Sequence, residues 1–328
     1  MRIHSDLSGI LVLDKEIGMS SMRAVEIARR RAGRAKAGHA GTLDPLATGV
    51  LPVAIGDATR LVDELVGAGK RYRAEILLGR ETDSYDIDGA VVEERDASGV
   101  TVDAVRAALS AFLGPIMQAP PAFSAIKRDG QPAYKAARRG DPLDLPLRPV
   151  TVYAIELLSL THEDRVARLT LDVRCGQGFY VRSLAHDLGA ALGVGGTIAA
   201  LRRTQVGAFL AEDAIPLARA VVRLESGDIE GLVLPPDTVV AHLPSVSMNE
   251  EKVVRVRNGL SMSLDGFVDA DRLLEVAQVR CYGPDGAFVG MLRPKGAEGL
   301  WHPFRVFPPD TIAPRSGGSR VDSPPHVP

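Results

Sequence analysis

The sequence predicts an α+β fold with a mixed, largely antiparallel central sheet flanked by helices, followed by a small β-rich C-terminal domain. Three observations support this class. Strand-like and helix-like segments mix along the chain without the regular alternation of a doubly wound fold. Residues 168–175 alternate strictly between apolar and polar types, as a half-buried strand does. From about Glu250 onward, short strands and turns predominate.

Apolar spacing and capping residues place the elements of the first half. Residues 9–15 predict a short buried strand, and residues 20–33 predict a helix with a serine N-cap and a glycine stop. A second helix is expected over 58–69 and a strand over 70–79. Residues 101–114 then predict a helix whose cap is the threonine at its start.

The second half contains a long interruption of this pattern. Residues 118–149 are rich in proline, glycine and basic residues, which predicts an inserted excursion of functional importance. After the alternating strand, two glycines turn the chain into a helix over 176–193. Residues 277–294 predict a hairpin with Pro-Asp-Gly at its turn. The expected units are a first domain over 1–240, a β-rich domain over 241–308 and a disordered tail over 309–328.

Composition limits the classes of protein to which the chain can belong. The length of 328 residues and the hydrophobic fraction of 45% suffice for a buried core and suggest two domains. No apolar run could span a bilayer, and the start of the chain does not have the pattern of a signal peptide. The two cysteines, Cys175 and Cys281, are far apart and lack metal-ligand spacing. We therefore expect a reduced, cytoplasmic protein without a metal.

The charges are unevenly distributed, although the net charge is only −2. Residues 23–36 carry six cations against Glu26 alone. A second basic group consists of Lys127, Arg128, Lys135, Arg138 and Arg139. Either group alone would be interpreted as a solvated surface. Because both lie in the same half of a nearly neutral chain, an anionic partner is favoured.

The segment GHAGTLDPLATGVLPVAIG, residues 38–56, holds a single acid, Asp44, in a restricted loop. This acid could be a turn residue, a metal ligand, a general base or a nucleophile, and the Asp-Pro dipeptide alone favours a turn. The neighbouring His39, Thr42 and Thr48 and the apolar run that follows favour a rigid loop that presents the acid for nucleophilic attack. The sequence has no glycine-rich phosphate loop, zinc-ligand spacing or nucleophile elbow.

Several segments together resemble the bacterial tRNA pseudouridine-55 synthases of the TruB type. The segment HAGTLDPLATGVLPVAIGDATRL resembles the catalytic motif of that family. The other resembling segments are LVLDKEIGMSS, KRYRAEILLGRETDSYDIDG, PPAFSAIKRDGQPAYKAARRG, VRCGQGFYVRSLAHDLG and LRRTQVGAF. They occur in the order of the family over roughly residues 9–209.

The resemblance implies an enzyme that isomerises uridine to pseudouridine at position 55, in the T-loop of tRNA, without a cofactor. Asp44 corresponds to the nucleophile, and attack on the sugar and formation of a glycal-like intermediate both stay open. Tyr72 would stack on the target base and is a candidate for the base that removes a proton. Arg182 would pair with Asp44 and keep it ionised in a dry pocket.

The remaining residues implied by the resemblance contact the substrate. Tyr180 and Leu201 would line the pocket, and His39 would occupy the space that the flipped base leaves. Lys15 lies in the segment that resembles the N-terminal motif of the family.

The resemblance also implies a pseudouridine-synthase-like fold, an RNA-binding insertion around 118–149 and a PUA-like RNA-binding domain over 241–308. The expected partner is the T-arm of tRNA, bound by a monomer that involves no membrane and no metal. A second role as a tRNA folding chaperone is compatible with this enzyme. Two alternatives remain, namely an RNA-binding folding factor in which catalysis is secondary and a guide-RNA-dependent pseudouridine synthase. The excursion and the lack of a long basic tail favour stand-alone recognition.

Overall fold

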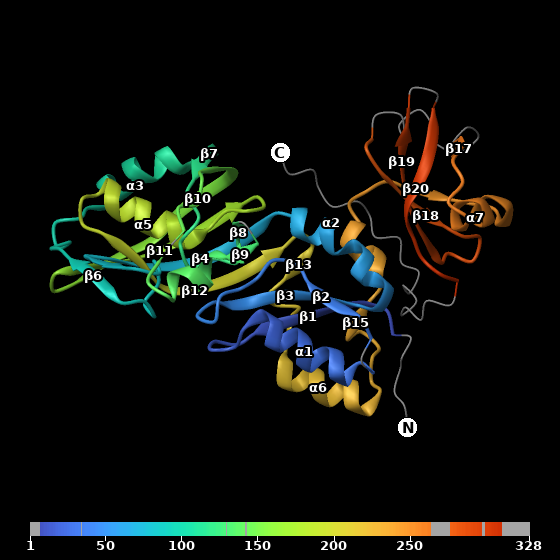
Figure 1. The fold of residues 1–328 in the computed structure, drawn as a ribbon, viewed down its shortest axis with the longest axis horizontal. Coiled ribbons are helices and arrows are strands. Elements are labelled where there is room, and N and C mark those ends of the chain that lie inside the picture. The colour runs from blue at the N-terminus through green and yellow to red at the C-terminus, as the bar shows by residue number, and fades with distance from the viewer. Residues whose placement is uncertain are drawn as a thin grey trace.

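The computed structural model of the chain describes residues 7–33, 35–128, 130–141, 143–263, 276–296 and 299–309. Its largest feature is a mixed sheet that runs the length of the main body (Figure 1). The strands of this sheet are β1 (Gly9–Lys15), β2 (Ala37–His39), β3 (Thr48–Ile55), β4 (Lys70–Leu78), β7 (Gly114–Gln118), β10 (Arg148–Glu163), β11 (Val166–Cys175), β12 (Gly196–Val206), β13 (Phe209–Leu210), β14 (Ile215–Pro216) and β15 (Val233–Leu234).

The strand order is β14-β1-β3-β12-β4-β11-β10-β7, with β15 beside β1, β2 beside β3 and β13 beside β12. The pairs β1–β14 and β3–β12 are parallel. The other pairings in this sheet are antiparallel. The predicted α+β class, with a mixed and largely antiparallel sheet, is confirmed.

Helices cover two parts of the sheet. The helices are α1 (Ser21–Arg31), α2 (Val62–Gly67), α3 (Val102–Leu109), α4 (Ala133–Ala137), α5 (Val181–Ala191), α6 (Leu217–Ser226) and α7 (Glu250–Arg257), and short 3₁₀ turns are η1 (Gly56–Leu61), η2 (Ser110–Phe112) and η3 (Pro236–Val240). The helices α3 and α5 pack on β10, β12 and β4, whereas α1 and α6 pack on β1 and β3 (Figure 1). One apolar core joins both groups.

The strand β1 is apolar throughout because it is covered on both faces. Leu11 and Leu13 belong to the core beneath α1 and α6. Ile10 and Val12 point to the opposite face, into a second cluster that includes residues of η1 and η3. The strand and helix expected here are present, and Ser20 Oγ caps α1 by accepting the Arg23 N–H at 3.2 Å. The helix expected over 58–69 is divided into η1 and α2.

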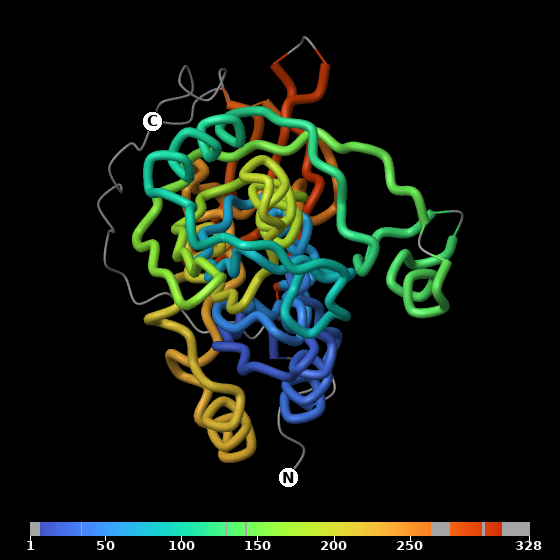
Figure 2. Tube along the Cα trace, turned by 90° about the vertical axis from the view of Figure 1, so that its left-hand side faces the viewer, coloured from blue at the N-terminus to red at the C-terminus, as the bar shows by residue number. Residues whose placement is uncertain are grey.

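The excursion leaves the sheet after β7 and returns to it at β10. It contains a small hairpin of β8 (Lys127–Arg128) and β9 (Gln131–Pro132), followed by α4. In the end-on view this segment projects away from the main body (Figure 2). A second hairpin, of β5 (Arg80–Thr82) and β6 (Val91–Glu94), follows β4 directly and contacts β12.

The C-terminal part forms a separate sheet of order β16-β18-β19-β20-β17. Its strands are β16 (Ser245–Ser247), β17 (Met262–Ser263), β18 (Val279–Tyr282), β19 (Phe288–Lys295) and β20 (Leu300–Val306). The expected hairpin of β18 and β19 is present. This sheet contacts the main body through an ion pair of Arg305 with Asp63 at 2.9 Å and through buried Phe307.

The expected tail lies outside the described residues from position 310 onward. Within the described ranges, none of the helices has the length and apolar character that crossing a membrane requires.

Candidate active site

Buried groups fix the loop that carries Asp44, which connects β2 to β3. The hydroxyl of Ser21 donates to Leu43 O at 2.9 Å and accepts the Leu43 N–H at 2.8 Å. On the other side of the acid, Pro45 O accepts the Gly18 N–H at 2.8 Å and the Lys15 ammonium at 3.3 Å. The predicted turn is present, because Ala47 N donates to Asp44 O at 3.0 Å. The backbone on both sides of Asp44 is therefore held in place.

A far part of the chain, the first turn of α5, brings an arginine to this loop. Arg182 Nε lies 2.9 Å from Asp44 Oδ2. The other guanidinium nitrogens donate to Ser84 O at 2.9 Å and to Phe123 O at 2.8 Å. Arg182 is 4% exposed, so the ion pair lies at the boundary between the protein interior and the open side of the loop.

A second carboxylate, Asp86, shares this arginine, and sequence reasoning missed it. Asp86 Oδ2 lies 3.3 Å from Arg182 Nη1, and its other oxygen accepts the Ser84 hydroxyl at 2.6 Å. Asp86 is 7% exposed. The residue lies inside a segment that resembles the family, but its position in a short hairpin loop gave no signal of its own.

The environment of Asp44 raises its pKa above the ordinary value for an aspartate. Burial is the largest cause, and the negative charge of Asp86 acts in the same direction. The positive charges of Arg182 and Lys15 oppose this rise. A carboxylate in such a place loses part of its hydration, which favours nucleophilic attack over hydrogen bonding to water.

Two adjoining hollows meet at the Asp44–Arg182 pair. One hollow, which we call the catalytic cavity, has a volume of about 230 Å³ and is lined by residues that include Asp44, Tyr72, Phe179, Tyr180, Arg182, Leu201 and Arg203. The outer hollow is lined by residues that include His39, Asp44, Asp86, Phe123, Arg138 and Arg182. Thus one hollow can hold a flat ring on apolar and aromatic walls while the other leads out past the excursion. Across the described ranges, no three His, Cys, Asp or Glu side chains group together as metal ligands.

Arg203 forms the floor of the catalytic cavity, and it was not predicted either. The side chain is 1% exposed. Its Nε donates to Val50 O at 2.8 Å and its Nη1 donates to Gly41 O at 3.2 Å. These carbonyls lie on the two sides of the Asp44 loop, so one guanidinium ties both ends of that loop together.

The backbone of Arg203 also fits closely against the loop. In the parallel pairing of β12 with β3, Arg203 lies opposite Gly49. A Cβ at Gly49 would come within 2.1 Å of Arg203 O, and the φ of Gly49 is +101°. Only glycine permits this approach. The neighbouring arginine in the sequence, Arg202, instead pairs with Asp14 on the outer side of the sheet.

Tyr72 lies beside Arg203 on the adjacent strand β4. Burial raises the pKa of the Tyr72 hydroxyl, whereas the Arg203 guanidinium lowers it. Burial is the larger effect, so the phenol is neutral in the ground state. The ring is 9% exposed and lines the catalytic cavity.

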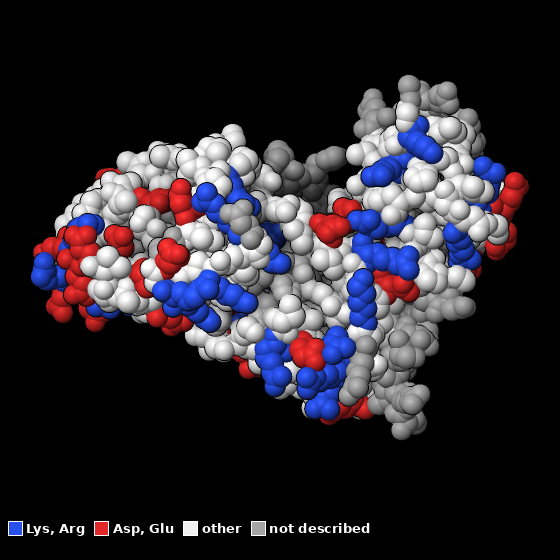
Figure 3. Space-filling model, in the orientation of Figure 1, with Lys and Arg blue, Asp and Glu red and all other residues white. Residues whose placement is uncertain are grey.

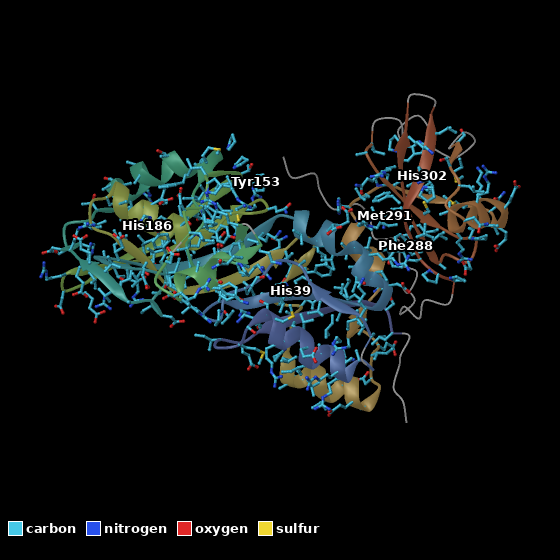
Figure 4. All side chains as sticks on the ribbon, viewed as in Figure 1. His39, Tyr153, His186, Phe288, Met291 and His302 are labelled. Carbon is cyan, nitrogen blue, oxygen red and sulfur yellow. The ribbon has the colours of Figure 1, made fainter. Side chains whose placement is uncertain are left out.

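The four residues expected to contact substrate occupy different positions. Tyr180 and Leu201 line the catalytic cavity. His39 lines the outer hollow near the middle of the molecule (Figure 4), and burial lowers the pKa of its imidazole. Lys15 is 1% exposed and lies beneath the loop. Its ammonium donates hydrogen bonds to Glu16 O, Met19 O and Pro45 O, which indicates that Lys15 supports the loop and does not contact the substrate.

The two basic groups differ in how their charges are balanced. In α1, Arg29 and Arg30 both pair with Glu26, at 2.8 and 2.6 Å, and Arg31 pairs with Glu225 at 3.0 Å. Acidic atoms lie among the basic ones on these lower helices (Figure 3). In the part of the excursion that the structure describes, the five cations form no ion pair. Those cations are Lys127, Arg128, Lys135, Arg138 and Arg139, and all are exposed.

Two family models match consecutive parts of the chain. Residues 29–181 match the family described as TruB family pseudouridylate synthase (N terminal domain). Residues 182–241 match the description tRNA pseudouridylate synthase B C-terminal domain. Asp44 and Tyr72 thus lie in the first match, and Arg182 and Arg203 lie in the second.

Two curated proteins named tRNA pseudouridine synthase B are similar over most of their length. One, from Dehalococcoides mccartyi, is 38% identical over 301 residues, which cover 92% of this chain and 97% of that protein. The other, from Xanthomonas oryzae, is 42% identical over 302 residues, which cover 92% of this chain and 94% of that protein.

A solved structure titled "Structure of H/ACA RNP bound to a substrate RNA containing 2'-deoxyuridine" has a similar fold. Its TM-score is 0.68 at 27% identity, and the match covers 93% of this chain and 87% of that chain.

Proposed function

The chain belongs to the TruB family of pseudouridylate synthases and is a tRNA pseudouridine synthase. From this premise we propose that it modifies uridine 55 in the T-loop of tRNA and that Asp44 is the nucleophile. The choice of the T-loop rests on the resemblance of the sequence to the pseudouridine-55 synthases. The single observation that carries the role of Asp44 is its 2.9 Å pair with buried Arg182, where the two hollows meet.

The reaction is an isomerisation, so its atoms balance without a co-reactant. The N1–C1′ bond of uridine breaks, the uracil turns, and a C5–C1′ bond forms. The proton on C5 is then lost, and N1 gains one. An Asp44 oxygen either bonds to C1′, or takes the C2′ proton as a glycal-like intermediate forms and returns it to C2′ when the C5–C1′ bond forms. Both routes need an ionised carboxylate with one free oxygen, which fits a side chain that is 37% exposed.

Arg182 has two functions in this proposal. Its guanidinium orients the carboxylate, because two backbone carbonyls fix the arginine before substrate binds. Its charge also keeps Asp44 ionised against the effects of burial and of Asp86. Arg203 and Lys15 act through the loop rather than on the uridine, so they are positioning residues.

Tyr72 would stack on the uracil in the catalytic cavity. A neutral phenol cannot remove the C5 proton, so this role requires a phenolate that forms during the reaction. The Arg203 guanidinium beside the hydroxyl is the group that would favour that ion. Tyr180 and Leu201 would form the remaining walls, and His39, with its neutral imidazole, would face the RNA at the outer hollow.

A uridine within a folded arm must leave its stack to reach this cavity, which costs a few kcal/mol. We propose that the five exposed cations of the excursion bind phosphates and offset this cost. The C-terminal sheet would act as a PUA-like RNA-binding domain over 241–308. The protein would work as a monomer, and in the cytoplasm, where tRNA is modified.

The comparisons favour stand-alone action over guide-RNA dependence. The curated relatives named for tRNA are 38% and 42% identical, whereas the RNP structure is 27% identical. The folding-factor role is separable from catalysis, because an Asp44 variant that is inactive could still promote aminoacylation of misfolded tRNA. No gain over buffer in that assay would eliminate this role.

The decisive experiment is tritium release from a tRNA transcript labelled at C5 of uridine. Asp44→Asn should abolish release and leave tRNA binding within a few-fold of wild type. Asp103→Asn, an exposed acid in the first turn of α3, serves as the matched control and should be fully active. Full activity of Asp44→Asn would show that the assignment of the nucleophile is wrong.

A further inference from the structure

Tyr153 is an unusual residue on the surface of the main body. It is 56% exposed and is the only aromatic residue among the large exposed hydrophobic side chains of the described chain. Exposed aromatic rings on rigid strands are typical of surfaces that bind unpaired nucleotides. Figure 4 places it at the upper side of the main sheet, on the side toward the C-terminal sheet.

A β-bulge directs this side chain outward. In the pairing of β10 with β11, Val152 lies opposite Cys175 and Ala154 lies opposite Arg174, so Tyr153 has no partner in the ladder. Bulges commonly change the direction of a side chain beside a functional site. The exposure of Tyr153 therefore follows from the backbone and does not depend on a flexible loop.

Tyr153 and Arg174 form two walls of a small hollow of about 280 Å³. The remaining lining residues are Gly69, Lys70, Gln205 and Gly207. Arg174 is exposed, and its guanidinium has neither a hydrogen bond nor an ion pair within the described part of the chain. By contrast, Arg71, which lies opposite Arg174 in the β4–β11 pairing, is paired with Asp172 at 2.6 Å.

This hollow adjoins the catalytic cavity around the end of the sheet. Lys70 lines both of them. Gly176 lines the catalytic cavity, and a Cβ at that position would come within 3.3 Å of Tyr153 Oη. The ammonium of Lys70 donates hydrogen bonds to Val66 O and Ala68 O. Of the two cations that line the hollow, Arg174 is therefore the one available to bind a phosphate. The Tyr153 ring therefore lies close to the catalytic cavity.

We propose that Tyr153 and Arg174 form a second nucleotide-binding site, which holds one unstacked nucleotide of the substrate tRNA outside the catalytic cavity. The base would stack on the Tyr153 ring, and its phosphate would accept hydrogen bonds from the Arg174 guanidinium. The site rests on the proposed function, because its ligand is part of the same tRNA. Occupation of this site would hold the strand while the target uridine is flipped.

The test compares four variants in the tritium-release assay with a tRNA transcript. Loss of base stacking should raise KM of Tyr153→Ala roughly 5- to 100-fold and leave kcat unchanged. Tyr153→Phe should remain within two-fold of wild type, because the ring is retained. Leu158→Ala, another exposed apolar residue of β10, is the matched control and should not change KM.

The fourth variant, Arg174→Ala, should weaken tRNA binding. It should also reduce the slope of log Kd against log salt concentration by about 1, the amount expected for the loss of one phosphate contact. A KM of Tyr153→Ala within two-fold of the wild-type value would contradict the proposed nucleotide-binding site. A KM of Tyr153→Phe as high as that of Tyr153→Ala would contradict it as well. Melting temperatures of all variants should equal that of wild type. If the wild-type protein released no tritium, the proposed function would fail instead, so the two failures are distinguishable.

Discussion

Arg182 and Asp44 form an asymmetric ion pair: their atoms are 2.9 Å apart, but the arginine side chain is 5% exposed and the aspartate 37% exposed. The arginine is held from behind by Ser84 O and Phe123 O, so its position does not depend on the acid. The acid keeps one side open to the cavity. The pair is thus organised before substrate binds, which is how electrostatic catalysis avoids reorganisation during the reaction.

The first prediction concerns the pH dependence that this pair controls. Arg182→Lys should lower kcat/KM by roughly 100-fold or more, because lysine cannot contact both carbonyls and the carboxylate together. In the proposed mechanism Asp44 acts as an anion, so activity should fall as pH decreases through its pKa. Loss of the guanidinium contacts raises that pKa further, and the acidic limb of the rate profile should move to higher pH.

The matched variant for this prediction is Asp86→Asn, which should shift the acidic limb in the opposite direction. The charge of Asp86 raises the pKa of Asp44, and its removal lets Asp44 ionise at lower pH. Measuring kcat/KM between pH 4.5 and 8 for both variants would check the signs. Shifts in the same direction would contradict this electrostatic account of the site.

The second prediction concerns Arg203, which ties the two ends of the catalytic loop. Arg203→Lys keeps the charge but cannot reach Val50 O and Gly41 O together, and an unsatisfied buried carbonyl costs about 1–3 kcal/mol. We expect a lower kcat with nearly unchanged KM, because the loop is displaced while the tRNA surface is intact. Arg202→Lys, on the outer side of the same strand, is the control. A rise in KM alone would argue against a positioning role.

The third prediction separates the two basic groups of the chain. Lys135→Ala or Arg139→Ala, in the excursion, should weaken tRNA binding. Each should also reduce the slope of log Kd against log salt concentration by about 1, as expected for the loss of one phosphate contact. Arg29→Ala should change neither, since Glu26 already neutralises that cation. Binding titrations at several salt concentrations would show the difference. Equal effects of Arg29 and Lys135 would mean that α1 also binds RNA.

The fourth prediction concerns stability at alkaline pH. Burial lowers the pKa of Lys15 from 10.5 to about 8, although Asp44 acts in the opposite direction. Between these values the unfolded chain holds more protons than the folded chain, so the free energy of unfolding should increase with pH. The contribution is up to about 1.4 kcal/mol per pH unit. Below pH 8, Lys15 is protonated in both the folded and the unfolded chain, so the free-energy cost of burying its charge does not change with pH.

Urea unfolding at pH 7.5, 8.5 and 9.5 would measure this effect. The stability difference between wild type and Lys15→Met should grow in favour of wild type as pH rises. Lys127→Met, at an exposed position, should give a difference that does not change with pH. A flat difference for Lys15→Met would contradict the lowered pKa.

Local patterns were sufficient to predict much of the fold. The strands at 9–15 and 168–175 follow from apolar runs and alternation, and the α1 helix follows from its serine cap. These features depend on neighbours in the sequence, so the sequence displays them directly. The structure adds that Arg29 and Arg30 pair with Glu26 at i,i+3 and i,i+4 spacing, which the sequence analysis did not consider and which reduces the importance of that basic run.

Asp86 and Arg203 could not be predicted in the same way. Each acts through contacts between elements that are far apart in the sequence, such as Arg182 with Asp86 and Arg203 with Gly41. No periodicity or spacing encodes such a contact. Asp44 could be singled out as a candidate because its loop has an unusual composition, whereas the groups that surround it are ordinary residues until the chain folds.

The close contact of Gly49 with Arg203 has a consequence for how the enzyme folds. The hydrogen bond from Arg203 to Val50 joins residues that are 153 positions apart. Contacts of such long sequence separation form late, because a long loop must close before they contribute. During refolding, activity should therefore appear after most of the secondary structure. A nascent chain that ends before β12 would carry Asp44, Tyr72 and Arg182 and still lack the strand that completes their site.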